Sequence, residues 1–266
     1  MKRRKKVSRG ALRLVEGGKP AKAPDLVKGD VQRMLTVCQH FERWIGPVAQ
    51  VMHETQSEIV HVDVHVIMPR PERPYITLFT TGMSELPMKT PCTCCPNRLE
   101  LMMTLPADWP LPAPSCECCA GKVSPHLPRS EPRLWPVTCL RYLARYPHRM
   151  GKWLGFGHTV QNGHPPERFA PDAAFCCSLI LPPLSIPPEA LELAGPDGET
   201  IEILAPYPIY RPEMQLKLRR GTPALLARLE RAGVTDLVDT RRPDSVTGKC
   251  YPEKPDGRSR KPRRRA

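Results

Sequence analysis

Two cysteine clusters of the same pattern are the residues of this chain whose types and spacing best suit chemistry. They read Cys92-Thr93-Cys94-Cys95 and Cys116-Glu117-Cys118-Cys119, and they lie on either side of the segment LELMMTLPADWP. Thiolates are soft ligands that hold zinc in tetrahedral sites. The sequence therefore offers six candidate ligands for a Zn²⁺ ion: Cys92, Cys94, Cys95, Cys116, Cys118 and Cys119.

The spacing of the two clusters leaves three interpretations open. A strand of about eight residues is about 26 Å long, so both clusters reach one ion only if the proline-rich loop after the strand folds back. A zinc site, a set of reduced surface thiols and a redox switch are all compatible with the pattern. Cys176 and Cys177 stand in an apolar run, where we expect them to be small core residues.

Three polar residues, His61, Asp63 and His65, alternate with valines in the stretch IVHVDVHVIM. This period of two predicts a β-strand over residues 59–68 with one apolar face and one polar face. Residues i and i+4 of a strand are about 13 Å apart, so one metal ion can contact at most two of the three side chains. We therefore interpret them as a polar strand face.

The sequence shows no catalytic constellation. His158 and His164 lie near glycines, but no carboxylate pair or phosphate-binding loop accompanies them. Ser84 lacks the second glycine of the G-x-S-x-G nucleophile elbow. We therefore expect a protein that is not an enzyme.

Predicted helices and strands are interspersed along the chain. Asp30 can cap a first helix, whose apolar positions at helical spacing are Val31, Met34, Leu35, Cys38 and Phe41. The 34 prolines restrict the backbone and remove donors, so central strands should be short. The element order predicts the α+β class, an α/β sandwich with a mixed sheet and helices packed against it. Predicted helices also cover 48–54, 134–146, 212–219 and 223–231, and predicted strands cover 59–68, 75–81, 98–105, 174–181, 201–205 and 234–239.

The net charge of +13 is concentrated at the two ends of the chain. Residues 1–22 hold nine Lys or Arg and one Glu, and residues 241–266 hold ten Lys or Arg and three acids, which leaves 23–240 at −2. Such basic runs are typical of disordered tails that contact nucleic acid weakly and without specificity. We predict basic disordered tails over 1–23 and 244–266 and one domain over 24–243.

No apolar run approaches the ~20 residues of a membrane span, and the N-terminus lacks a signal-peptide pattern. We therefore expect a cytoplasmic protein without a membrane partner.

Six phrases, in order along the chain, resemble the suppressor-of-fused (SUFU) domain family. They are YITLFTTGMSELPM, LELMMTLPADWP, WPVTCLRYLARYPH, WLGFGHTVQNG, FCCSLILPP and KLRRGTPALLARLERAGVTDLVDTRRP. The resemblance covers roughly residues 45–243. It implies the family's α/β sandwich in the form of the N-terminal lobe alone, as in bacterial single-lobe members. The two C-x-C-C clusters look like a departure from the family pattern.

The resemblance implies a non-catalytic module that binds and sequesters a protein partner. Two-lobed members clamp a transcription-factor peptide between their lobes, whereas bacterial single-lobe members resemble immunity proteins that neutralise a toxin. A cognate toxin is therefore the sharpest expectation for the partner, and a zinc- or thiol-dependent regulatory module built on the C-x-C-C clusters is the alternative. Glycine permits close backbone approach, and tryptophan and methionine are favoured interface anchors. On these grounds the candidate partner-binding residues are Gly82, Met83, Ser84, Trp153, Gly157 and His158.

Overall fold

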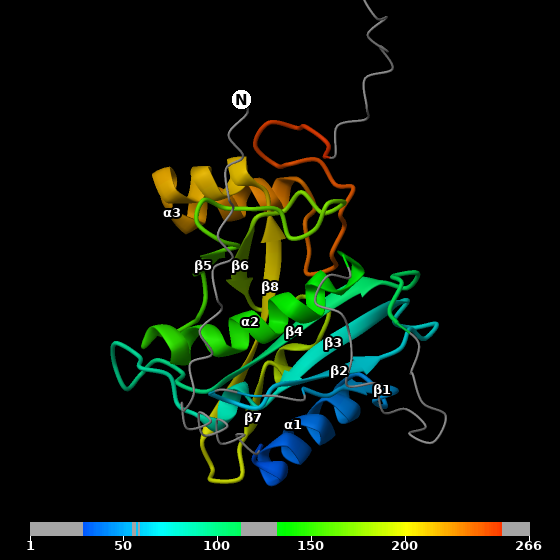
Figure 1. Cartoon of the computed structure of the whole chain (residues 1–266), viewed down its shortest axis with the longest axis vertical. Coiled ribbons are helices and arrows are strands. Elements are labelled where there is room, and N and C mark those ends of the chain that lie inside the picture. Colours follow the sequence, from blue (N-terminus) through cyan, green and yellow to red (C-terminus); the bar gives the residue numbers. More distant parts are fainter. Residues whose placement is uncertain (1–28, 55–56, 58, 113–131, 252–266) are drawn as a thin grey trace, which may run out of the picture.

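An eight-stranded mixed sheet forms the centre of the computed structural model, which describes residues 29–54, 57, 59–112 and 132–251. The strand order is β1-β2-β3-β4-β8-β6-β5, and β7 pairs with β8 (Figure 1). Paired strands are antiparallel except β4 and β8. The predicted α+β class with a mixed sheet is confirmed. The strands are β1 (Gln50–Met52), β2 (Asp63–Ile67), β3 (Tyr75–Thr81), β4 (Leu99–Pro106), β5 (Thr159–Gln161), β6 (Cys177–Leu181), β7 (Glu192–Ala194) and β8 (Thr200–Ile209).

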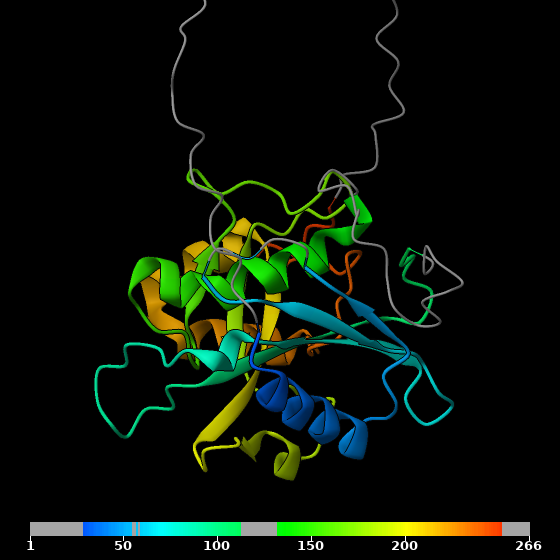
Figure 2. The same cartoon turned by 60° about the horizontal axis from the view of Figure 1, so that its bottom comes forward.

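Helices cover both faces of the sheet. α2 (Trp135–Met150) packs on one face of β2, β3 and β4, and α1 (Val31–Trp44) lies on the opposite face (Figure 2). α3 (Arg211–Arg231) contributes to the same core cluster as α1, through Leu225 and Leu229. Among the described residues, none of the helices combines the length and the apolar character that crossing a membrane requires.

Both faces of β2 are buried, so the prediction of a half-exposed strand is wrong. Asp63 and His65, on the face expected to be solvated, are 2% and 5% exposed. The ring of Phe79 stacks on the rings of His65 and Phe41, with centroids 4.8 and 3.9 Å away. α1, which carries Phe41, therefore covers this polar face. The alternation of apolar and polar residues identified the two faces of β2 correctly. It carries no information about which element packs on the polar face.

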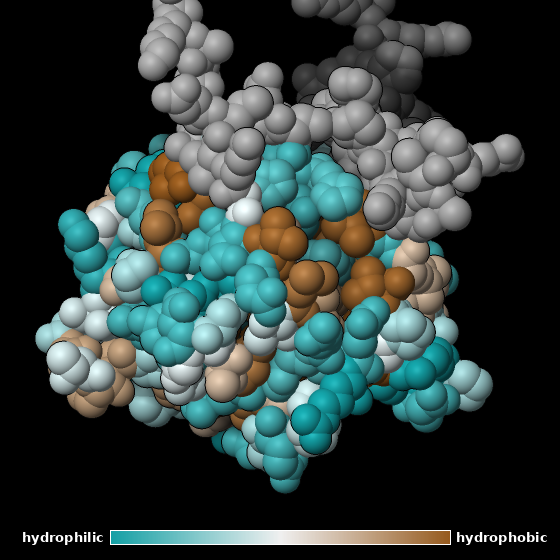
Figure 3. Space-filling model, turned by 90° about the horizontal axis from the view of Figure 1, so that it is seen from below, coloured by the Kyte–Doolittle hydropathy of each residue, from teal (hydrophilic) through white to brown (hydrophobic). Residues whose placement is uncertain are grey.

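α1 begins where the sequence predicts, and Phe41 faces the core as expected, but two other predicted apolar positions do not. The Asp30 carboxylate accepts a hydrogen bond from the backbone N–H of Arg33 and caps the helix. Val31 and Leu35, predicted for the apolar face, are 67% and 49% exposed. The buried guanidinium of Arg33 pairs with Asp197 in the loop between β7 and β8. Seen from below, the surface of the molecule carries apolar residues that are separated by polar residues (Figure 3). The buried positions of α1 are Arg33, Val37 and Phe41.

Two other predicted elements are wrong in type. The stretch 48–54 is not a helix, because it contains β1. The stretch 234–239 forms only a single bridge, from Leu237 to Thr104, instead of a strand. The predicted helices 212–219 and 223–231 do exist, as the two halves of α3 on either side of Gly221, whose φ of 82° interrupts the helical conformation.

β8 is the longest strand of the sheet although it contains two prolines, which contradicts the expectation that central strands are short. Residues 205–209 pair with β6, whereas pairing with β4 ends at Leu204. The pairing places the backbone nitrogens of Pro206 and Pro208 on the side away from β6, where none of the described strands pairs with this part of β8. Proline is tolerated there because no ladder hydrogen bond is lost.

The structure describes residues 244–251, beyond the predicted domain boundary at residue 243, in contact with the domain. The buried carboxylate of Asp244 accepts hydrogen bonds from the backbone N–H groups of Val246 and Thr247. The ring of Tyr251 lies 5.1 Å from the ring of Tyr210. The basic composition of the C-terminal region concealed these contacts. The predicted tail 1–23 and residues 252–266 lie outside the described residues.

Candidate partner-binding pocket and cysteine loop

A pocket of about 500 Å³ is formed where the loop before β4, the C-terminal end of α2, the segment 151–160 and α3 meet. Trp153 and His158, two of the predicted partner-binding residues, form part of its wall, together with Tyr146. None of the described residues that line it is acidic. The pocket therefore combines aromatic surface with positive charge, which comes from Lys89, Lys152 and Lys217.

Backbone hydrogen bonds to β6 hold the segment that carries Trp153 and His158. The N–H of Gly157 donates to the carbonyl of Ile180 at 2.8 Å, and the N–H of Ile180 donates to the carbonyl of His158 at 2.9 Å. The rings of Trp153 and His158 meet edge to face, with centroids 4.3 Å apart. Gly157 is buried at φ +76°, and a Cβ there would lie 3.1 Å from the Thr222 side chain. The conformation of Gly157 therefore sets the path of the segment that carries Trp153 and His158.

The lysines, not His158, supply the positive charge of the pocket at neutral pH. Burial, together with the charge of Lys217, lowers the pKa of His158 below its ordinary value of 6.5, although a backbone hydrogen bond opposes this. Burial also lowers the pKa of Lys217, whose ammonium group donates to the hydroxyl of Thr159 at 3.1 Å. The arrangement suits a ligand group that is anionic and lies beside an apolar surface.

Gly82, Met83 and Ser84 lie in the interior instead of on a partner-accessible turn. Met83 is 1% and Ser84 0% exposed. The backbone N–H groups of Gly82 and Ser84 donate to Oε1 of Glu100 at 3.0 and 2.9 Å, and the Ser84 hydroxyl donates to the same oxygen at 2.7 Å. The Thr80 hydroxyl donates to Oε2 at 2.6 Å. The phrase TTGMS therefore forms a cradle for a buried carboxylate, and these three residues do not line the pocket.

Glu100 is the residue of this cradle that sequence reasoning missed. Burial raises its pKa to about 7, although the hydrogen bonds from Thr80, Ser84 and Gly82 act in the opposite direction. The available signal was a single acidic residue inside the apolar strand LELMMTL. Such a residue is almost never fully buried unless it is paired or hydrogen-bonded.

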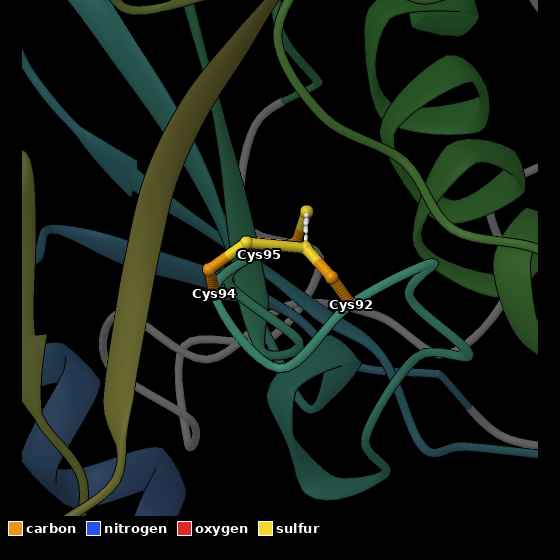
Figure 4. A group of neighbouring side chains, drawn as sticks. All are labelled: Cys92, Cys94 and Cys95. Carbon is orange, nitrogen blue, oxygen red and sulfur yellow. Dashed lines mark hydrogen bonds between the residues drawn. A yellow bond between two sulfur atoms is a disulfide. The ribbon is translucent and has the colours of Figure 1, made fainter.

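Three of the predicted metal ligands, Cys92, Cys94 and Cys95, lie together on the loop between the 3₁₀ turn η1 (Met83–Glu85) and β4 (Figure 4). Cys92 and Cys94 are joined by a disulfide, and the sulfur atoms of Cys92 and Cys95 are 2.9 Å apart. All three sulfurs lie within 4.8 Å of one another. Because the metal ligand is a thiolate, this group fits zinc only in its reduced form. The other predicted ligands, Cys116, Cys118 and Cys119, lie outside the described residues.

The buried thiols have no features of a reactive site. Cys176 and Cys177 are 3% and 0% exposed, which confirms the prediction that they are core residues. Burial raises the pKa of Cys177 and of Cys139 to about 12. Both side chains therefore remain protonated thiols at neutral pH.

The sequence matches the model of a known protein family. Residues 58–243 match the family model described as Suppressor of fused protein (SUFU). No curated protein sequence matches the chain.

Solved structures of similar fold carry the same name. A SUFU homologue from Neisseria gonorrhoeae has a TM-score of 0.57 at 16% identity, and the match covers 80% of this chain and 97% of that one. A chain of the Sufu–Fu complex has a TM-score of 0.51 at 14% identity, with 81% of this chain and 88% of that one covered.

The family match and the fold agree with each other. The matched residues extend from the loop before β2 to the arginine pair after α3, and so include the sheet from β2 to β8 and the cradle of Glu100. They make up more than half of the chain. This chain therefore belongs to the Suppressor of fused protein (SUFU) family.

Proposed function

We propose that this SUFU domain binds and sequesters a protein partner without covalent chemistry, at the pocket lined by Trp153, His158 and Lys217. The observation that carries the proposal is family membership together with a solved family structure that is a complex with a protein, the Sufu–Fu complex. The pocket supports it because a half-buried tryptophan beside a cavity is the kind of anchor that concentrates binding energy in interfaces.

The charges of the pocket support a partner segment that places an acidic side chain or terminus near Lys217. Three lysines without an acidic neighbour in the described lining complement such a group and disfavour a basic one. Phe156, in the same segment as Trp153, is 58% exposed and adds apolar surface at this edge of the domain.

The experiment is a capture of partners from native lysate, followed by affinity measurements with variants. Full-length protein and a chain limited to residues 24–251 should both retain the same protein in near one-to-one ratio. Trp153→Ala should weaken binding by about tenfold or more, and Lys217→Glu should weaken it further by opposing charge. Trp44→Ala, a half-buried tryptophan on α1 away from the pocket, is the matched control and should bind as the wild type does.

Two outcomes would contradict the proposal. Equal effects of the Trp153 and Trp44 substitutions would place the binding surface elsewhere. Retention of nothing but nucleic acid, lost with the tails and weakened steeply by salt, would limit the partners to contacts of the basic ends.

The sharpest form of the proposal is immunity: the partner is a cognate toxin that this protein neutralises. It rests on the resemblance to single-lobe bacterial members, and the Neisseria gonorrhoeae homologue, 97% of which is covered by the match, is a bacterial protein of matching extent. Cells that lack this protein should become sensitive to one effector encoded nearby, and Trp153→Ala should restore protection less well than wild type. If no effector becomes toxic, this form fails while partner binding stands.

We also propose, as a second candidate, that the cysteine loop regulates binding through its thiols. The observation in favour is that Cys92, Cys94 and Cys95 are grouped directly after Pro91, which lines the pocket. Reduction of the Cys92–Cys94 disulfide should then change partner affinity, and Cys94→Ser should abolish that response. Identical affinities with and without reductant, and no zinc bound through these cysteines in the reduced protein, would exclude both the thiol and the zinc version.

A further inference from the structure

The ends of β1 and β2 bring together three side chains that the sequence analysis did not group. β1 and β2 pair antiparallel, so His53, which follows β1, falls opposite Asp63, the first residue of β2. Nδ1 of His53 is 2.7 Å from Oδ2 of Asp63, and Nε2 of His61 is 3.1 Å from Oδ1. His65 is not part of this group, because its Nε2 lies 2.9 Å from the hydroxyl of Thr81.

The hydrogen bonds around His61 direct its Nε2 at a carboxylate oxygen of Asp63. The Ser57 hydroxyl donates to Oε2 of Glu54 at 2.7 Å, so its only hydrogen is in use. Its 3.0 Å contact with Nδ1 of His61 must therefore be a bond donated by Nδ1–H. Nε2 of His61 then faces a carboxylate oxygen of Asp63 with its lone pair. Only a second ring proton or a metal ion makes that contact favourable.

The surroundings suit a metal ion with one open coordination position. The side chain of Asp63 is 3% exposed, that of His61 21% and that of His53 45%, so the group is anchored inside and open on the His53 side. The charged groups that act on His61 are Asp63 and Glu85, which are acidic, and Arg141, whose guanidinium donates to a backbone carbonyl of β1. β1 is the last strand at this end of the sheet (Figure 1).

We propose that His53, His61 and Asp63 form a binding site for a divalent transition-metal ion of the zinc type. Imidazole nitrogens and a carboxylate oxygen bind zinc at about 2.0–2.2 Å, and ligand atoms of a tetrahedral site are then about 3.3 Å apart. The nitrogen–oxygen pairs at 2.7 and 3.1 Å need to open by about 0.6 and 0.2 Å, and all three ligand atoms lie within 4.8 Å of one another. The ion replaces the proton at Nε2 of His61, which passes to solvent, and the hydrogen at Nδ1 of His53, which moves through solvent to Nε2 of the same ring.

The outer partners of this site are already in place. Ser57 orients the ring of His61 through Nδ1, and Glu54 holds Ser57. The backbone N–H of Glu54 also donates to Oδ1 of Asp63 at 3.0 Å. Hydrogen-bonded partners of this kind fix the tautomer of a metal-binding histidine and raise its affinity for the ion.

The test is calorimetric titration of full-length, metal-free protein with ZnCl₂. The clustered cysteines Cys92, Cys94, Cys95, Cys116, Cys118 and Cys119 are replaced by serine to remove competing thiolates. One zinc ion per chain is expected. His53→Ala and His61→Ala should abolish binding, Ser57→Ala should weaken it by about tenfold or more, and His148→Ala, a half-buried histidine outside the group, should leave it unchanged. No uptake of zinc, or the same affinity in the His53 variant, would overturn the proposal.

A second measurement covers the case in which the serine variant does not fold. The imidazole resonances of the wild-type protein are followed by NMR during the zinc titration. The His53 and His61 signals should change together, while those of His148 and His158 stay in place. If the His53 and His61 signals do not respond to zinc, the site does not exist.

Discussion

Glu100 links the family phrase TTGMS to the stability of the fold, and its replacement by glutamine tests that link. The side chain is completely buried, and its Oε1 accepts three hydrogen bonds, from Gly82 and twice from Ser84. Glutamine keeps this oxygen and the shape of the side chain. It cannot ionise, and its amide nitrogen replaces Oε2, which accepts from the Thr80 hydroxyl. Because that change of hydrogen bonding does not depend on pH, the pH dependence of the stability difference isolates the effect of the charge.

The sign and size of the effect follow from the pKa of Glu100, which burial raises from 4.5 to about 7. Between these values the folded state holds a proton that the unfolded state releases, so the free energy of unfolding falls as pH rises. Each pKa unit corresponds to about 1.4 kcal/mol. The wild type should therefore lose about 3 kcal/mol of stability through this residue between pH 4.5 and pH 7.5, and the glutamine variant should not.

Urea denaturation at a series of pH values measures this difference. The free energy of unfolding of Glu100→Gln minus that of the wild type should move by about 3 kcal/mol in favour of the variant from pH 4.5 to 7.5. Glu189→Gln, at an exposed position, is the control and should follow the wild type. Parallel profiles of wild type and Glu100→Gln across this range would refute the reasoning, because Glu100 would then have the same pKa in the folded and unfolded chain.

Two further substitutions test how the ends of the domain and the cradle are held. Arg242 pairs with the fully buried Glu213 through two hydrogen bonds of 2.7 and 2.8 Å, so Arg242→Ala should destabilise the fold by about 3–5 kcal/mol. Arg241→Ala, whose side chain is exposed, should stay within about 0.5 kcal/mol of wild type; equal denaturation midpoints for the two would contradict the role of the ion pair. Gly82→Ala should prevent folding or cost several-fold more than Gly198→Ala, because both glycines have positive φ but only the methyl group at Gly82 would overlap the backbone carbonyl of His61. Thermal unfolding of both variants provides the comparison, and similar melting temperatures would show that the overlap is relieved at no cost.

The candidate pocket was predictable only in part. Trp153 and His158 stand out by residue type in a glycine-rich segment, and both line the pocket. Lys89 and Lys217 gave no signal, because they are far apart in the chain and neither lies in a recognisable motif. The turn of Gly82, Met83 and Ser84 was assigned to the surface, since its composition is that of an exposed turn and the carboxylate that it encloses lies on another strand.

The proposed metal site of His53, His61 and Asp63 was likewise predictable from the sequence only in part. His61 and Asp63 share a strand face by alternation, which the sequence displays directly. His53 joins them only through the pairing of β1 with β2, in a stretch that was predicted to be helical. The error in that element therefore concealed the third side chain.

The family, the mixed α and β composition, most strands and helices, and the capping of α1 by Asp30 could all be predicted from the sequence. These features depend on residues close together along the chain, whose spacing reflects backbone geometry. The folded structure was needed to show that α1 buries the polar face of β2, that Glu100 is enclosed, that prolines fit in β8 and that residues 244–251 contact the domain. Each of these depends on contacts between segments distant in the sequence, because burial and pairing are set by what packs against a segment and not by its own pattern.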